Sequence, residues 1–174
     1  MNVEELKSVI RDVPDFPKQG IVFKDITTLL KSPVHFCQCV DYLTSHFQNF
    51  DFDFVLGPEA RGFVFGAPVS YKLEKGYILV RKAGKLPAKT RKVTYSLEYG
   101  EDSLFVHEDA ITKGTRVVII DDLLATGGTV SAMTQLVEDM GGIIAGIGFV
   151  VELKFLEGRK KLKGYDIYSL IQYD

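Results

Sequence analysis

The chain has 174 residues, of which 46% are hydrophobic and 25% charged, and its formal net charge at pH 7 is −2. This composition excludes a disordered chain, and the length fits a single domain over residues 1–174 with a buried core. The charge excludes a general basic surface for nucleic acid or an anionic membrane. No stretch reaches the ~18 apolar residues of a membrane span, and the amphipathic start lacks a signal-peptide pattern. We therefore expect a cytoplasmic protein with neither nucleic acid nor membrane as a partner.

Hydrophobic periodicity and turn residues predict alternating helices and strands along the first half of the chain. An amphipathic helix over 1–12 precedes a loop over 14–26 with a short extended piece at 22–24. Ser32 and Pro33 are typical of a helix start, and the helix that follows carries Cys37 and Cys39, which we expect to be buried, reduced thiols. The next predicted elements are a strand at 52–57, a helix at 62–74 and a strand at 77–82.

The second half of the chain predicts an antiparallel hairpin and then further alternation. The hairpin spans 91–107 and is followed by strands at 115–120, 143–153 and 165–171, a helix at 129–142 and a short solvated helix at 155–162. Unbroken apolar strands separated by helices predict an α/β fold with a doubly wound, mainly parallel sheet. Ligands of such sheets bind beyond the carboxyl ends of the strands, here the segments 57–61, 81–85 and 121–129.

The segment VVIIDDLLATGGT (117–129) places Asp121 and Asp122 at the end of a buried strand, immediately before a turn of small residues. The helix that begins near Gly128 has unpaired N–H groups and a partial positive charge at its start, which favour a phosphate. The two acids, expected to face solvent or ligand, suit sugar hydroxyls or a hydrated divalent metal ion. The alternative is a tight turn in which Thr126 or Thr129 caps the helix and the acids are solvated.

Three other segments carry candidate functional side chains. Arg61, which follows a Gly-Pro turn, could bind phosphate as a fork or form a surface ion pair with Glu59. The basic run VRKAGKLPAKTRK (80–92) could be a solvated face or a mobile anion-binding loop. Glu98, within SLEYG, could be an exposed carboxylate or an acid/base group that faces a pocket.

Together these segments resemble the adenine-specific branch of the purine phosphoribosyltransferases. VVIIDDLLATGGT resembles the phosphoribosyl pyrophosphate motif of that family, and PDFPKQGIVFKDI, ARGFVFG, VRKAGKLP and SLEYG resemble adenine-specific elements in the same order. The resemblance implies a type I phosphoribosyltransferase fold with a small N-terminal hood and a flexible-loop hairpin. It also implies purine salvage by a homodimer that transfers the 5-phosphoribosyl group from phosphoribosyl pyrophosphate to N9 of adenine, giving AMP and pyrophosphate.

The resemblance also implies a role for each candidate residue. Magnesium would bind mainly through the donor's own oxygens, without a dedicated metal site in the protein. The peptide bond between Glu59 and Ala60 would be cis, and Tyr99 would help to close the site. The implied sets are Ala125, Thr126, Gly127, Gly128 and Thr129 for the 5-phosphate; Asp121 and Asp122 for the ribose hydroxyls and the cationic transition state; Arg61, Arg81, Lys82 and Lys85 for pyrophosphate; and Val22, Phe23, Lys24 and Glu98 for adenine, with Glu98 assisting proton removal.

Two other functions remain open from the sequence. One is a regulator that senses phosphoribosyl pyrophosphate on the same scaffold; it would need a helix-turn-helix appendage or a basic face, and it would have no use for an acid/base residue such as Glu98. The other is the same enzyme class acting on guanine, xanthine or uracil, against which IVFKDI and LEYG weigh. Lys24 stands where many relatives carry arginine, which weakens a planar stacking role at that position.

Overall fold

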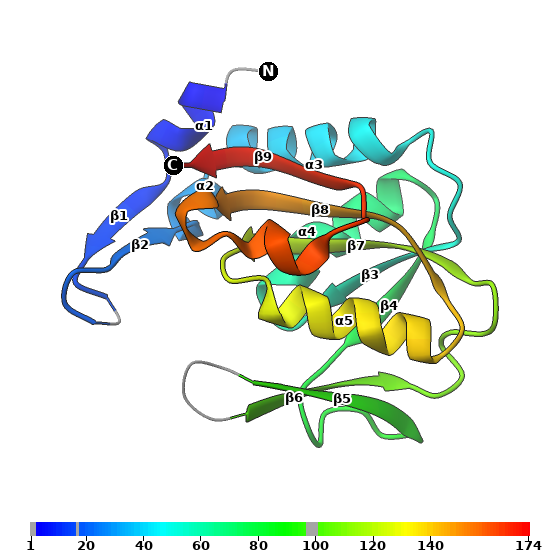
Figure 1. Ribbon diagram of the computed structural model, residues 1–174. Helices are drawn as coiled ribbons and strands as arrows, with labels where there is room; N and C mark the ends of the chain where they lie inside the picture. Colours follow the sequence, from blue (N-terminus) through cyan, green and yellow to red (C-terminus); the bar gives the residue numbers. More distant parts are fainter. Residues whose placement is uncertain (1–2, 17, 97–100) are drawn as a thin grey trace.

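The computed structural model describes residues 3–16, 18–96 and 101–174, and a five-stranded parallel sheet lies at its centre (Figure 1). The strand order is β4-β3-β7-β8-β9, and every neighbouring pair is parallel. This confirms the predicted α/β class and the parallel sheet. The strands are β3 (Phe54–Pro58), β4 (Gly76–Val80), β7 (Arg116–Leu124), β8 (Ile143–Leu153) and β9 (Ile167–Tyr173).

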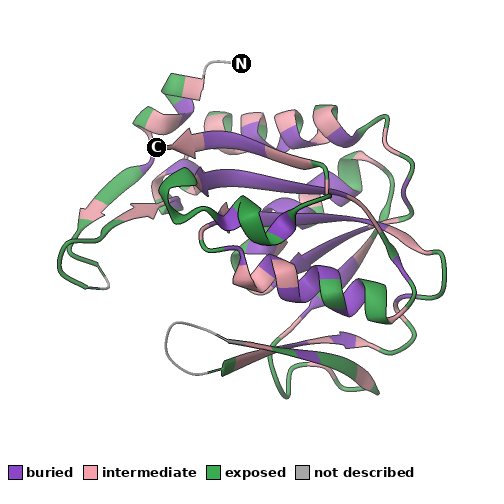
Figure 2. Ribbon diagram, viewed as in Figure 1, coloured by how far each residue is buried: buried purple, intermediate pink, exposed green. Residues whose placement is uncertain are grey.

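Helices cover both faces of the sheet. The helices α3 (Pro33–Phe47) and α4 (Arg61–Lys72) pack on one face, and α5 (Gly128–Asp139) packs on the other. Successive residues of β7 therefore enter different cores: Val118 and Ile120 join the first, whereas Val117 and Ile119 join the second. A strand buried on both sides needs an unbroken apolar run. The central strands are accordingly buried along most of their length (Figure 2).

Two small antiparallel hairpins flank the central sheet. The hood consists of α1 (Val3–Ser8), β1 (Arg11–Pro14), β2 (Val22–Asp25) and α2 (Thr27–Lys31), and the strands β8 and β9 point toward it (Figure 1). The other hairpin joins β5 (Thr90–Ser96) to β6 (Glu101–His107), as predicted. The strand β1 was not predicted, because the apolar periodicity of the first helix runs on past Ser8. Ion pairing of Arg11 with Asp25 at 2.7 Å holds this segment in the hairpin.

Besides the first helix, which ends at Ser8 instead of running to residue 12, three sequence-based expectations are wrong. The strand β7 does not end at Ile120 but continues to Leu124, because β8 is long enough to pair with it as far as Glu152. Cys39 is buried, but Cys37 is exposed on the outer side of α3. The short helix expected at 155–162 is two 3₁₀ turns, η1 (Lys154–Leu156) and η2 (Gly158–Leu162), separated by Glu157 at φ 54°.

The start of α3 lies where Ser32 and Pro33 predict it, but the capping chemistry differs. Pro33 is the first helical residue, and the Ser32 hydroxyl pairs with Nδ1 of His35 at 2.6 Å instead of capping the backbone. Within the described ranges, no helix combines the length and the apolar character that crossing a membrane requires.

Candidate active site

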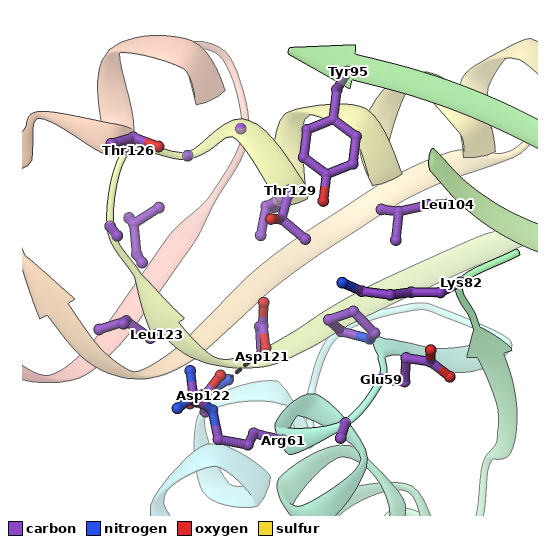
Figure 3. Close-up of a pocket in the computed structure, with 17 residues that line it drawn as sticks. Glu59, Arg61, Lys82, Tyr95, Leu104, Asp121, Asp122, Leu123, Thr126 and Thr129 are labelled. Atoms are coloured by element: carbon purple, nitrogen blue, oxygen red, sulfur yellow. Dashed lines mark hydrogen bonds and ion pairs between the residues drawn. The ribbon is translucent and has the colours of Figure 1, made fainter. Parts of the chain in front are cut away.

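A cavity of about 400 Å³ opens where β3 and β7 end and α4 and α5 begin (Figure 3). Two of the three predicted strand-end segments meet here, and the third contributes one lysine. Nine of the residues predicted to bind the donor line this cavity: Arg61, Lys82, Asp121, Asp122, Ala125, Thr126, Gly127, Gly128 and Thr129. Arg81 and Lys85, which were predicted with them, are not among its lining residues.

Asp121 and Asp122 form a buried pair of adjacent carboxylates on β7, with residue exposures of only 7% and 5%. Both were expected to face solvent or ligand just beyond the strand's end; they lie instead within β7, largely out of solvent, and line the cavity. Burial raises the pKa of Asp121 well above its ordinary value, and the neighbouring Asp122 charge raises it further. Burial also raises the pKa of Asp122, although the Arg61 guanidinium opposes this effect from 2.7 Å. Loss of water therefore disfavours the ionised form of both carboxyl groups, and the neighbouring negative charge disfavours it further at Asp121.

The small residues after β7 build a turn that exposes backbone amides to the cavity. Gly127 precedes α5 with φ +78°, a left-handed conformation that glycine adopts without strain. No side chain caps the first turn of α5, so neither Thr126 nor Thr129 acts as the simple N-cap that the alternative reading required. The first N–H groups of a helix lack intrahelical acceptors and carry partial positive charge, so this turn can hold an anion.

Each described cation of the cavity faces a carboxylate. Lys82 Nζ lies 3.1 Å from Asp102 Oδ2, and this hydrogen bond raises the pKa of Lys82. Arg81 pairs with Glu59 and Arg61 with Asp122, so the surface ion pair of Arg61 with Glu59, one of the two alternatives for Arg61, is not formed. Burial raises the pKa of Glu59, but the hydrogen bond and charge of Arg81 outweigh it and lower the pKa overall. The peptide bond between Glu59 and Ala60 is cis, as the resemblance implies.

Tyr95 is a cavity residue that the sequence interpretation missed. It comes from β5, and its hydroxyl points into the cavity toward Thr129 and lies 3.4 Å from Asp102 Oδ2 (Figure 3). The signal was available in the period of two along the strand, since Val93 on the same strand is buried in the core beneath α5. The predicted hairpin therefore contributes one wall of the site as well as a loop.

The hood residues lie beside the cavity rather than in its lining. The Arg61 guanidinium carbon lies 5.9 Å from the centre of the Phe23 ring, which places that ring at the cavity's edge. Lys24 Nζ pairs with Asp12 at 2.6 Å and lies 4.2 Å from the centre of the Tyr173 ring. Val22 is exposed. Glu98 and Tyr99 lie outside the described residues.

Three comparisons place the chain among known proteins. A sequence model of the phosphoribosyl transferase domain matches residues 26–171. The adenine phosphoribosyltransferase of Koribacter versatilis is 56% identical over 171 residues, which cover 98% of this chain and 94% of that protein. The crystal structure of adenine phosphoribosyltransferase from Thermoanaerobacter pseudethanolicus superposes with a TM-score of 0.95 at 55% identity, over 99% of this chain and all of the other.

A more distantly related crystal structure was determined with ligands bound. Adenine phosphoribosyltransferase from Saccharomyces cerevisiae, complexed with an imino-altritol bisphosphate and adenine, is 38% identical, with a TM-score of 0.90 over 97% of this chain and 98% of that one. The fold, the composition of the cavity and these matches agree. The chain belongs to the phosphoribosyl transferase domain family.

Proposed function

We propose that this chain transfers the 5-phosphoribosyl group of phosphoribosyl pyrophosphate to N9 of adenine, giving AMP and pyrophosphate for purine salvage. The observation that carries the proposal is a single continuous element, residues 117–129, which brings two carboxylates and an anion-binding turn into one cavity. A sugar phosphate presents the matching groups, hydroxyls at one end and a phosphate at the other. The relatives that match nearly the whole chain are adenine phosphoribosyltransferases.

The donor is held by backbone at one end and by charge at the other. The amides of residues 125–129 and the hydroxyls of Thr126 and Thr129 bind the 5-phosphate, at the start of α5. Asp121 and Asp122 accept hydrogen bonds from the ribose hydroxyls. The pyrophosphate lies toward Arg61 and Lys82, with Arg81 and Lys85 on the same basic segment completing its neutralisation.

Catalysis follows from a change of charge at the ribose. The bond from C1 to the pyrophosphate oxygen breaks with its electron pair leaving on pyrophosphate, and C1 becomes cationic before N9 attacks. In the resting site Arg61 neutralises Asp122 at 2.7 Å. The arriving pyrophosphate competes for this guanidinium, which frees the Asp122 carboxylate for the sugar. The cation at C1 then forms beside two carboxylates that burial keeps poorly hydrated.

The base binds at the hood. Phe23 stacks on adenine, Val22 and Lys24 complete the pocket, and backbone groups of β2 read the edge of the base. Because Asp12 and the Tyr173 ring already engage the Lys24 ammonium, Lys24 contributes the apolar stem of its side chain to the pocket rather than a free charge. Glu98 removes the proton from adenine as N9 attacks, and Tyr99 closes over the site to exclude water.

Magnesium fits this site as part of the bound donor. In the described parts of the chain, no group of three or more His, Cys, Asp or Glu side chains lies close enough to hold a metal ion. Asp121 and Asp122 would instead help to hold a hydrated magnesium ion that arrives with the donor. When bound, the ion neutralises charge on the leaving pyrophosphate.

The organisation of the protein completes the proposal. Residues 1–174 act as one domain, since both cores share the strands of a single sheet. Cys37 and Cys39 are free thiols, which suits the reducing cytoplasm.

A second copy of the chain covers α4 and the sheet's edge, where Val64, Tyr71 and Leu79 are 37%, 85% and 41% exposed.

The choice of base is tested by a coupled assay with phosphoribosyl pyrophosphate and magnesium against adenine, hypoxanthine, guanine, xanthine and uracil. We expect pyrophosphate release with adenine, and turnover at least about 10²-fold slower with each other base, because the pocket's polar groups would be left unpaired. Preference for another base would reassign the acceptor. Donor binding without turnover on any base would favour the sensor.

Asp121→Asn is expected to have opposite effects on stability and on turnover. The raised pKa of Asp121 means that the folded chain binds more protons than the unfolded chain above the ordinary Asp pKa, so wild-type stability falls as pH rises through that window. Asparagine does not titrate and can still accept the Asp122 backbone N–H at Oδ1, now 2.8 Å away. The variant should melt higher at pH 7, with the gain disappearing near pH 4, while kcat/KM for the donor falls about 10²-fold.

Calorimetry across pH and initial rates measure both effects, with Asp139→Asn, exposed on α5, as the matched control. A melting temperature at pH 7 at or below the wild type would contradict the destabilising burial of Asp121. Unchanged donor kinetics would remove Asp121 from the site.

Glu98→Gln should lower kcat by about 10²-fold or more while changing the KM for adenine little, because glutamine keeps the shape of the side chain but cannot accept the N9 proton. Steady-state kinetics with adenine measure the split, and Glu101→Gln, an exposed carboxylate on β6, serves as the control. Wild-type turnover in Glu98→Gln would exclude Glu98 from proton transfer.

Light scattering tests the homodimer. We expect a mass twice the 19.5 kDa of one chain, and a shift toward one chain in Tyr71→Glu, which places charge on the face shared with Val64. A wild-type mass of 19.5 kDa at micromolar concentration would rule the dimer out.

A further inference from the structure

The turn that precedes α5 rests directly on the backbone of the second 3₁₀ turn. An ideal Cβ added to Gly127 would lie 2.5 Å from the Gly158 carbonyl oxygen, and one added to Gly158 would overlap the Ala125 carbonyl oxygen. The same added Cβ at Gly158 would lie 3.1 Å from Gly127 N. No side chain separates the two segments at this point. Any displacement of Gly158 toward the cavity must therefore move the 125–129 turn.

The position of Gly158 is fixed by its neighbour Arg159. This guanidinium binds the Glu152 carboxylate in a two-point fork, with Nε to Oε1 at 2.7 Å and Nη2 to Oε2 at 2.8 Å. It also donates to Ser169 Oγ and to the Ile167 carbonyl, both at 3.3 Å. Glu152 is only 3% exposed. Burial raises the pKa of Glu152, but Arg159 outweighs it, so the carboxylate stays charged and the pair stays closed.

The fork is anchored on the same strands that carry the turn. Glu152 stands opposite Leu124 in the pairing of β8 with β7, and Leu124 is the last residue of β7 before the turn begins. The far end of η2 is also fixed, because Leu162 is buried in the core beneath α5. The sheet end, the turn and η2 thus form a closed ring of contacts.

We infer that Arg159, clamped to Glu152, is a positioning residue for the 5-phosphate, acting through the backbone of Gly158 on the turn formed by residues 125–129. The inference rests on the proposed function for the identity of the ligand. A turn whose amides are already aimed at one point loses little freedom when the phosphate arrives. Arg159 touches neither sugar nor base, so its effect falls on phosphate affinity.

The test compares Arg159→Lys with Arg116→Lys by titration calorimetry, using ribose 5-phosphate and adenine as separate probes. Lysine keeps the charge beside Glu152 but cannot form the fork. Arg116 is the matched control: it lies at the opposite end of β7 and donates to the Asp51 carbonyl at 2.7 Å. We expect Arg159→Lys to weaken ribose 5-phosphate binding by about tenfold to hundredfold and to raise the KM for the donor similarly, with adenine affinity unchanged.

A second variant, Gly158→Ala, tests the contact itself. Its added methyl group must displace the Ala125 carbonyl, so it should weaken ribose 5-phosphate binding even with the fork intact. Equal ribose 5-phosphate affinity in wild type, Arg159→Lys and Gly158→Ala would overturn the inference, as would equal losses in Arg159→Lys and Arg116→Lys at equal melting temperature. A wild type that binds ribose 5-phosphate but uses no base would contradict the proposed function, while the same comparison of variants would still decide this inference.

Discussion

The burial of two adjacent carboxylates at the end of the central strand is the constraint on which the site depends. The strand β7 is covered on both faces and stays paired with β8 past Asp121, so Asp121 and Asp122 lose water that only a specific partner can replace. In the described structure that partner is Arg61 for Asp122 and the backbone N–H of Asp122 for Asp121.

The cations around the cavity are likewise paired with specific partners. Arg61, Arg81 and Lys82 are each engaged by a carboxylate, so the site carries its cations in a neutralised form. A dianionic ligand must exchange these partners for its own oxygens, which favours ligands that bring several negative charges at once.

The sequence predicted those parts of the fold and site that depend on local patterns. Unbroken apolar runs identified the central strands, and nine donor-site predictions share one cavity because parallel strands end at the same edge. What the sequence could not show depends on distant pairing. The length of β8 keeps the acids of β7 buried, and the contact of Gly158 with Gly127 is invisible without the fold. The two 3₁₀ turns were predicted as one helix because their charged residues are equally typical of a solvent-exposed α-helix.

The anchoring of the hood has a consequence for the order of folding. Lys24 is held through the ring of Tyr173, and Lys7 lies 5.7 Å from the same ring centre. The hood comes early in the sequence, yet the surface on which it docks is the end of β9, which is the last strand of the chain and lies at the sheet's edge. Contacts at such long sequence separation form late, after most of the loop-closure entropy has been lost. We therefore expect the hood to dock after the central sheet has formed.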